Sequence, residues 1–280
     1  MRGSPIVMAD SAMHGAVRAA TDSRPFEVAA RAGYSISGIL HLVIAYIIVQ
    51  LAFGSGGNAD QSGALATLAA QPGGAVALWV TAGGLIALAL WRVAEIVLGS
   101  HPSEPGQEHH GASDVFDRAK SAALAAIYAG IALAAIRFAG GGGQSNSAQN
   151  TGLTARLLHN GWGKALLLIA AVVIVSVGGY HVYKGVSTKF EKDLTVSGGG
   201  PLITPLGIAG YTAKGVVLSG AGVLLAVATV TADPSKGAGL DASVKSLGEA
   251  PFGKVLLIAA AAGFAAYGAY CFVLARYARM

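Results

Sequence analysis

The chain has 280 residues, of which 54% are hydrophobic and only 12% are charged, and its mean hydropathy is +0.58. Soluble domains carry about 25% charged residues, so this composition excludes an ordinary soluble protein and indicates an integral membrane protein. The net charge of +5 then reflects basic residues beside anionic lipid, not binding to nucleic acid. The single cysteine, Cys271, excludes a disulfide within the chain and a cysteine-based metal cluster.

The chain opens with a polar segment over residues 1–30, which lacks the basic start and adjoining apolar run of a cleavable signal peptide. Six apolar runs follow, at 32–53, 75–98, 116–139, 162–185, 209–231 and 254–277. Each has about the 20 residues that cross a hydrocarbon core of roughly 30 Å. We therefore expect six transmembrane helices.

One twenty-residue stretch occurs three times: PGGAVALWVTAGGLIALALW from Pro72, GWGKALLLIAAVVIVSVGGY from Gly161 and PFGKVLLIAAAAGFAAYGAY from Pro251. The helices before the first and third copies also align, as AGYSISGIL from Ala32 and AGYTAKGVV from Ala209. An offset kept across two helices and a loop indicates internal duplication.

The duplication predicts an all-α, polytopic membrane protein in which three helical hairpins surround a pseudo-threefold axis. We expect a cytoplasmic N-terminal segment at 1–30, repeats at 31–98, 116–187 and 208–280, and cytoplasmic connections at 99–115 and 188–207. Before each second helix, the segments 63–71, 152–159 and 241–250 have apolar residues spaced as in short interfacial helices.

Basic residues predict the orientation. About 13 of the 19 Lys and Arg residues lie near the N-terminus, the two connections between repeats and the C-terminus. The positive-inside rule therefore places both termini in the cytoplasm. The loop at 53–74 has no basic residue, which fits an outer location.

The motifs AGYSISGIL, GALATLAAQPGG and LALWRVAE, with AGYTAKGVV and APFGKVLLIAAAAGFAAYGAY near the C-terminus, resemble a family of bacterial membrane proteins. The family is common in actinobacteria, has three two-helix repeats and is known as a domain of unknown function. The resemblance covers about residues 30 to 278 and implies six helices in a bacterial inner membrane, with no catalytic residues. The second repeat departs from the pattern, since Gly161 replaces the proline and its first helix lacks the glycine–tyrosine pair.

Ionisable residues in or near the apolar runs are the first candidates for a site. Arg92 and Glu95 are close enough on one helix to pair, and His181 occupies the position of Arg92 in the second repeat. These three residues are expected near the membrane surface. His41 lies deeper, roughly 13 Å along its helix. It is a weak candidate for a haem ligand or proton carrier, against the alternative of a buried, hydrogen-bonded histidine.

The loop HPSEPGQEHHGASD, from His101 to Asp114, combines three histidines with three acids. Imidazole and carboxylate groups bind zinc, nickel or iron, so His101, His109 and His110 are weak metal candidates. Their spacing matches no helical H-E-x-x-H motif, which favours a solvated polar connection.

Two other residue types are expected to have structural roles. The aromatic residues that end the three copies, Trp91, Tyr180 and Tyr270, predict an aromatic belt at the membrane surface, with a ligand-stacking ring as the alternative. The helix glycines predict close helix contacts: Gly33, Gly38, Gly83, Gly84, Gly178, Gly179, Gly215 and Gly263.

No P-loop, G-x-S-x-G elbow or strand-linked dinucleotide motif is present. We therefore expect no enzyme and no cofactor, but a scaffold or accessory subunit in the bilayer, with another membrane protein or a second copy as its partner. The alternatives are a small-solute or ion channel or transporter with a path along the repeat axis, and a haem- or metal-binding membrane protein.

Overall fold

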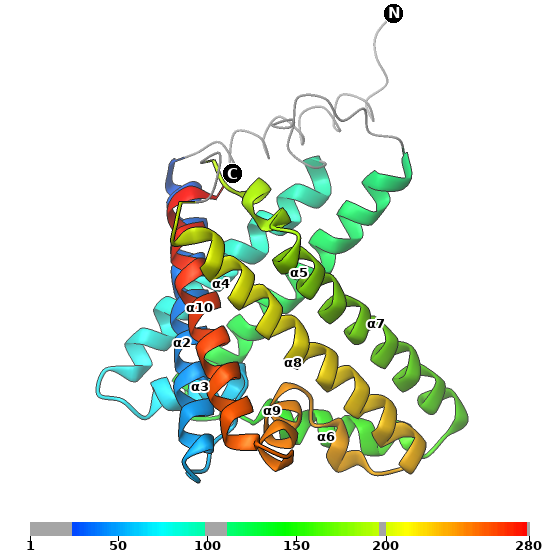
Figure 1. The fold of residues 1–280 in the computed structure, drawn as a ribbon. Coiled ribbons are helices and arrows are strands. Elements are labelled where there is room, and N and C mark those ends of the chain that lie inside the picture. Colours follow the sequence, from blue (N-terminus) through cyan, green and yellow to red (C-terminus); the bar gives the residue numbers. More distant parts are fainter. Residues whose placement is uncertain (1–23, 99–110, 196–199, 279–280) are drawn as a thin grey trace, which may run out of the picture.

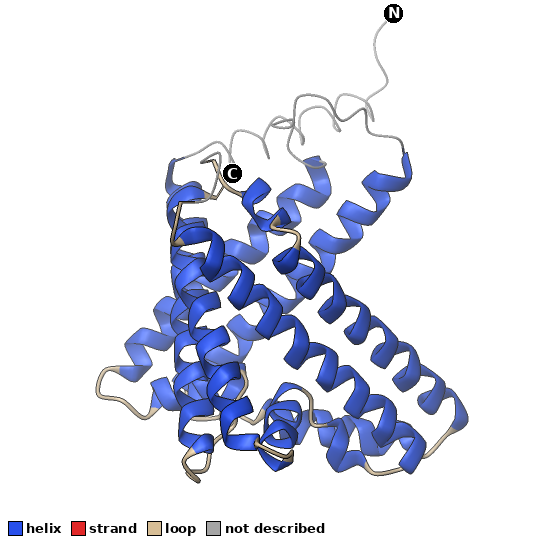
Figure 2. Cartoon of the chain, viewed as in Figure 1, coloured by secondary structure: helices blue, strands red, loops and turns tan. Residues whose placement is uncertain are grey.

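The computed structural model describes residues 24–98, 111–195 and 200–278, which are almost entirely helical (Figures 1 and 2). The long helices are α2 (Arg24–Ala52), α4 (Gly74–Leu98), α5 (Gly111–Ala139), α7 (Gly161–Val186), α8 (Ile203–Thr231) and α10 (Gly253–Tyr277). Each contains an apolar stretch long enough to cross a bilayer, so the six predicted spans are confirmed in the described part of the chain. Helices α2 and α10 lie side by side, with the start of α2 beside the end of α10 (Figure 1).

Three short α-helices and two 3₁₀ turns complete the fold. The α-helices are α3 (Gln61–Ala69), α6 (Asn146–Leu158) and α9 (Leu240–Glu249), and the turns are η1 (Lys189–Asp193) and η2 (Pro234–Gly237). Helices α3, α6 and α9 confirm the three short helices expected from sequence, although α6 begins six residues before the predicted start at 152. All three lie at the same end of the bundle (Figure 1).

The second helix of each repeat packs most extensively on the first helix of the next repeat. Helix α4 packs on α5, α7 on α8, and α10 returns to α2. Within the repeats, α8 contacts α10 and α2 contacts α4 less extensively, while α5 and α7 barely touch. The expected hairpins are therefore packed in the first and third repeats, but the most extensive contacts join helices of different repeats. The spans follow one another around the bundle in the order α5, α4, α2, α10, α8, α7, and this circle is open between α5 and α7, the two helices of the second repeat.

Small residues explain these pairings. A methyl group at Gly178 of α7 would lie 2.7 Å from the carbonyl oxygen of Gly215 in α8, and one at Gly38 of α2 would lie 2.9 Å from that of Gly268 in α10. Backbones this close have no room for a side chain. The predicted close contacts are confirmed for Gly33, Gly38, Gly84, Gly178, Gly215 and Gly263. They are wrong for Gly83 and Gly179, which face open space.

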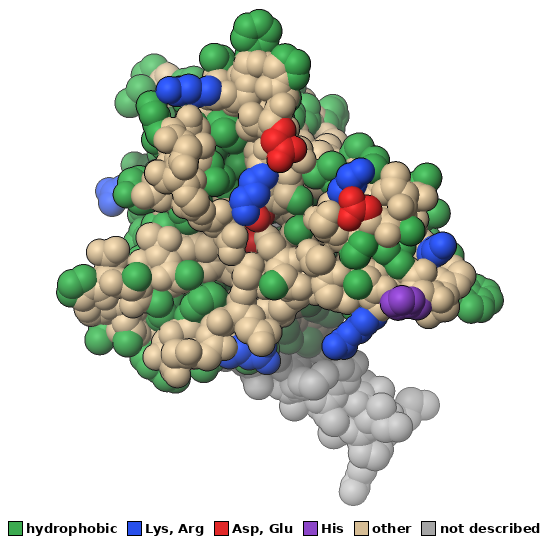
Figure 3. Space-filling view, turned by 90° about the horizontal axis from the view of Figure 1, so that it is seen from below, with side chains coloured by type: hydrophobic (Ala, Val, Ile, Leu, Met, Phe, Trp, Pro, Cys, Tyr) green, Lys and Arg blue, Asp and Glu red, His purple; other side chains and the backbone are tan. Residues whose placement is uncertain are grey.

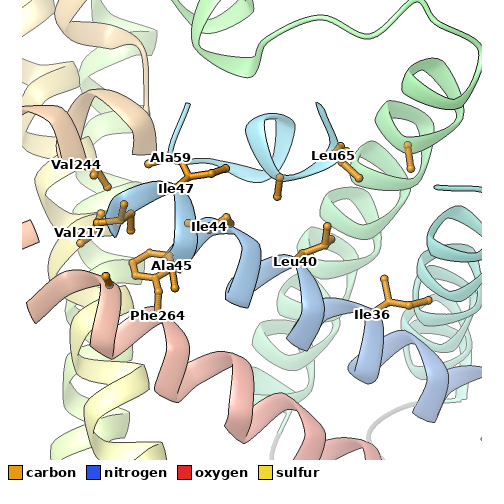
Figure 4. Close-up of a cluster of buried hydrophobic side chains, with 14 of the residues drawn as sticks. Ile36, Leu40, Ile44, Ala45, Ile47, Ala59, Leu65, Val217, Val244 and Phe264 are labelled. Atoms are coloured by element: carbon orange, nitrogen blue, oxygen red, sulfur yellow. The ribbon is translucent and has the colours of Figure 1, made fainter. Parts of the chain in front are cut away.

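The apolar core lies next to the short helices, inside the bundle, and receives side chains from all three repeats. Val217, Val244 and Phe264 gather beside α2 (Figure 4), and Ile44 and Ile48 of α2 are completely buried. The centre of the bundle at this level is therefore packed with apolar side chains.

At this end of the bundle, hydrogen bonds tie the short helices of the three repeats together. The buried carboxylate of Asp241 in α9 accepts the amide hydrogen of Ala59 at 2.8 Å and the hydroxyl hydrogen of Ser147 at 3.0 Å. Lys245 donates to the same carboxylate at 2.7 Å, and opposite charges adjoin on this face (Figure 3). Asp60, also buried, caps α3 through the amide of Gly63 at 2.9 Å. We call these residues the polar junction: Ala59, Asp60, Ser147, Asp241 and Lys245.

Candidate functional site

His41 is buried in the middle of α2. Its Nδ1 donates to the carbonyl oxygen of Ser37 at 2.7 Å, which leaves Nε2 as the remaining ring nitrogen. The ring centre lies 4.7 Å from that of Tyr267 and 6.1 Å from that of Phe264, both on α10. The position agrees with the buried, hydrogen-bonded alternative considered from sequence.

Lys214 lies beside His41, and sequence reasoning missed it. Its Nζ stands 4.1 Å from the centre of the Tyr267 ring, an arrangement in which the ring face attracts the cation. It is half-buried, and no carboxylate among the described residues pairs with it. The orientation count placed Lys214 with the cytoplasmic residues. However, it lies about 16 Å along α8 from Ile203, at the depth of His41 in α2.

The signal that could have revealed Lys214 is a basic residue inside an apolar run, since a charge at this depth is costly and such residues are functional candidates. The repeat alignment strengthens it. In the alignment that matches Gly38 with Gly215, Lys214 of the third repeat corresponds to Ser37 of the first. In the same alignment, His41 of the first repeat corresponds to Leu218 of the third. The two ionisable residues thus meet although each is peculiar to its own repeat. The glycines that let these helices pack are shared by the first and third repeats, whereas His41 and Lys214 each occur in one repeat only.

An aromatic column continues from Lys214 toward η1. Tyr211 lies 5.2 Å from Tyr267 and 5.5 Å from Phe190 between ring centres. The hydroxyl of Tyr270 donates to the carbonyl of Phe190 at 3.1 Å. The aromatic-belt prediction is therefore wrong for Tyr270, which is fully buried. It is also wrong for Trp91, which is 7% exposed, whereas Tyr180 is 48% exposed. The two buried residues face neighbouring helices because the repeats pack closely there.

We call His41, Lys214 and the adjoining rings of Tyr211 and Tyr267 the Lys214 cluster. Of the other predicted site residues, only His181 has a described contact with this cluster, through Tyr211. The His181 ring centre lies 5.9 Å from that of Tyr211, while its Nδ1 donates to the Val177 carbonyl at 2.8 Å. Arg92 Nη2 lies 3.5 Å from the Tyr34 hydroxyl. The side chain of Glu95 and the residues His101, His109 and His110 lie outside what the structure describes. Within the described part, no three His, Cys, Asp or Glu residues gather as metal ligands.

The comparison with protein families supplies the identification. The model of the family described as Domain of Unknown Function (DUF1206) matches three times, at 32–99, 119–188 and 209–278. The chain belongs to the DUF1206 family. These ranges coincide with the three repeats, so the repeat in this DUF1206 protein is the family's own unit.

One curated relative is similar over most of its length. It is the uncharacterized protein YxxB of Bacillus subtilis (strain 168), which is 28% identical over 256 residues, covering 89% of this chain and 90% of that protein. No solved structure matches the chain. A lysine and a histidine beside tyrosine rings can hold an anion or exchange a proton, which distinguishes the cluster from the apolar core next to it.

Proposed function

We propose that this DUF1206 protein is a non-enzymatic scaffold or accessory subunit of a larger membrane assembly, and that both its termini lie on the cytoplasmic side of the bacterial plasma membrane. The opening in the circle of helices, between α5 and α7, carries the proposal. Within the apolar window of each span, 17% of residues are buried in α5 and in α7, against 50% in α10. Two helices of one repeat are thus left with uncovered faces.

The chemistry of this opening suits another membrane helix. Gly130 of α5 and Gly179 of α7 have nothing near enough within the chain to meet an added methyl group. Lipid supplies no hydrophobic force between helices, so small residues that permit close backbone approach favour helix association. Large apolar side chains of the same two helices are also exposed, including Ile127, Leu133, Ile169, Val172 and Val173. A transmembrane helix of a partner protein is the occupant that we propose.

Cross-linking in native membranes tests this proposal. In a Cys271→Ser background, Val172→Cys places a thiol on the exposed face of α7, and Ile258→Cys places the matched thiol on α10. A benzophenone attached to either thiol inserts into nearby C–H bonds on illumination, and it should give a discrete adduct with one membrane protein from position 172 only. Equal adducts at both positions, or none at 172, would contradict the scaffold proposal.

The proposed orientation has its own test. In the same background, Lys236→Cys places a thiol at the end with the short helices, and Lys189→Cys places one at the opposite end; both native side chains are exposed. A membrane-impermeant maleimide should label position 236 in intact cells and position 189 only after permeabilisation. The reverse pattern would invert the topology.

A small-solute or ion transporter is the second candidate, and Lys214 is the observation that favours it. A cation at mid-span could bind a small anion that enters from the end carrying the aromatic column. The buried core at Ile44, Val217 and Phe264 lies between Lys214 and the short helices, which supports the scaffold proposal over an open pore. Ion flux into proteoliposomes that Lys214→Gln abolishes and Lys189→Gln leaves intact would establish transport. Absence of flux for a panel of small anions would count against it.

Haem or metal binding is a third hypothesis, based on Nε2 of His41, which has no hydrogen bond to the described residues, and on the residues of the 101–114 loop. The absorption spectrum and metal content of the purified chain test it. A Soret band lost in His41→Gln would support a haem ligand at that position, whereas a spectrum without one, in protein without stoichiometric metal, would remove this hypothesis.

A further inference from the structure

A shallow hollow of about 460 Å³ lies where the start of the α2 span meets the end of α10. It is separate from the Lys214 cluster and from the opening between α5 and α7. The described residues that line it provide two guanidinium groups, two hydroxyls and apolar surface: Arg31, Ser35, Phe272, Ala275, Arg276 and Tyr277.

The two arginines are held at the rim by the end of α10. Arg31 Nη1 donates to the carbonyl oxygens of Ala275 at 3.0 Å and Arg276 at 2.6 Å. The last carbonyls of a helix have no partner within the helix, so these two bonds cap the end of α10 and hold the Arg31 guanidinium in place. Arg276 is exposed, and its Nε donates to the Tyr277 hydroxyl at 3.2 Å. Two positive charges therefore share one concave surface.

The depth of the hollow matches the membrane–water boundary. Arg31 directly precedes the apolar run at 32–53, and Arg276 lies in the last turn of α10. Phe272, 39% exposed, lies about one turn, or roughly 6 Å, deeper along α10. The hollow thus has a cationic rim at headgroup level and an aromatic wall facing the hydrocarbon.

We infer that this hollow binds an anionic phospholipid of the phosphatidylglycerol class, with the lipid phosphate between Arg31 and Arg276 and the glycerol and acyl chains against Phe272. Guanidinium groups suit phosphate oxygens because their donors form a planar fork. A headgroup that carries an amine would bring a third positive charge to this rim. A free phosphate would leave the aromatic wall without a partner.

Lipid titration of the purified full-length chain, followed by native mass spectrometry, tests the site. Arg276→Gln is the main variant, because Arg276 is exposed and its one side-chain bond is to the adjacent residue. Arg118→Gln removes an exposed cation of α5, near the same end of the bundle, and is the matched control. Loss of one such charge should weaken phosphatidylglycerol binding about fivefold in Arg276→Gln. Arg276→Lys should recover most of the affinity, and Arg118→Gln should leave it unchanged.

Two further measurements separate a lipid from other ligands. Phosphatidylcholine should bind more weakly than phosphatidylglycerol to the unaltered chain, and glycerol 3-phosphate should not displace the lipid. Equal effects of Arg276→Gln and Arg118→Gln would overturn the site, and equal affinity for the two lipids would overturn its preference for an anionic headgroup. Displacement by glycerol 3-phosphate would replace the lipid with a soluble phosphate ligand.

Discussion

At the scale of single residues, the contrast between adjacent glycines shows how this bundle is specified. Gly178 faces α8 across an interface with no space for a methyl group, whereas its neighbour Gly179 faces outward with nothing within 4 Å. Glycine is intrinsically unfavourable in a helix by roughly 0.5–1 kcal/mol relative to alanine. The cost is therefore offset by packing at position 178 but not, within this chain, at position 179.

Alanine substitutions at these two positions should have opposite effects on stability. A methyl group at 178 would lie 2.6 Å from the amide nitrogen of Ser219, so Gly178→Ala should lower the free energy of unfolding by about 1–3 kcal/mol through overpacking. Gly179→Ala should leave it unchanged or raise it slightly. Thermal unfolding of each variant in the same detergent measures both effects. If the two variants melt alike, the α7–α8 contact is not as close as described.

At the scale of elements, the short helices do more than connect the spans. Through the polar junction, α9 contacts the segment before α3 and the start of α6, so one short helix links all three repeats. The amphipathic spacing in the sequence predicted these helices as interfacial elements. It did not predict that their polar sides would meet one another, because the partners are separated by up to 182 residues in the chain.

Asp241 provides the prediction at this scale. Asp241→Ala leaves the Ala59 amide without its acceptor and the Ser147 hydroxyl with only the Asp60 carboxylate, 3.5 Å away, and loss of a buried partner costs about 1–3 kcal/mol. Asp241→Asn should be milder, because its amide oxygen can still accept the Ala59 hydrogen. Glu249→Ala, an exposed acid of the same helix, is the control and should have little effect. Chemical denaturation in mixed micelles compares the three, and equal losses for Asp241→Ala and Glu249→Ala would refute the role of the junction.

At the scale of the whole molecule, the first and third repeats close on each other and the second repeat stays open. Helices α2 and α10 form one of the most extensive contacts, although they stand at opposite ends of the chain. The second repeat is also the one that departs from the glycine–tyrosine pattern in its first helix. The repeat that lacks the glycine–tyrosine pair is therefore the same repeat whose two helices, α5 and α7, do not pack on each other.

A disulfide between the first and last spans tests this closure. The Cys271 sulfur lies 3.9 Å from the Ser37 hydroxyl oxygen, so Ser37→Cys should form a disulfide with the native cysteine under mild oxidation. Ile39→Cys, at an exposed position two residues along α2, should not. Counting free thiols with a maleimide after denaturation distinguishes them. Two free thiols in oxidised Ser37→Cys would contradict the pairing of α2 with α10.

The sequence by itself determined the class of protein, the six spans, the three repeats and the positions of the short helices. Each of these depends on local composition or on a regular spacing, and both can be read along one chain. His41 could be selected for the same reason, as an ionisable residue in an apolar run. Lys214 could have been selected in this way too, but its helix was interpreted only as a copy of the first one.

Only the tertiary structure decided which helices pair, which aromatic residues are buried and which charges meet. The pairing of α4 with α5, α7 with α8 and α10 with α2 depends on which small residues face each other across repeats, and spacing along one helix cannot show this. For the same reason His41, Lys214 and Tyr267 form a cluster only because α2, α8 and α10 converge. Their proximity results from packing between distant segments, since nothing in the local sequence of any one helix specifies its partners.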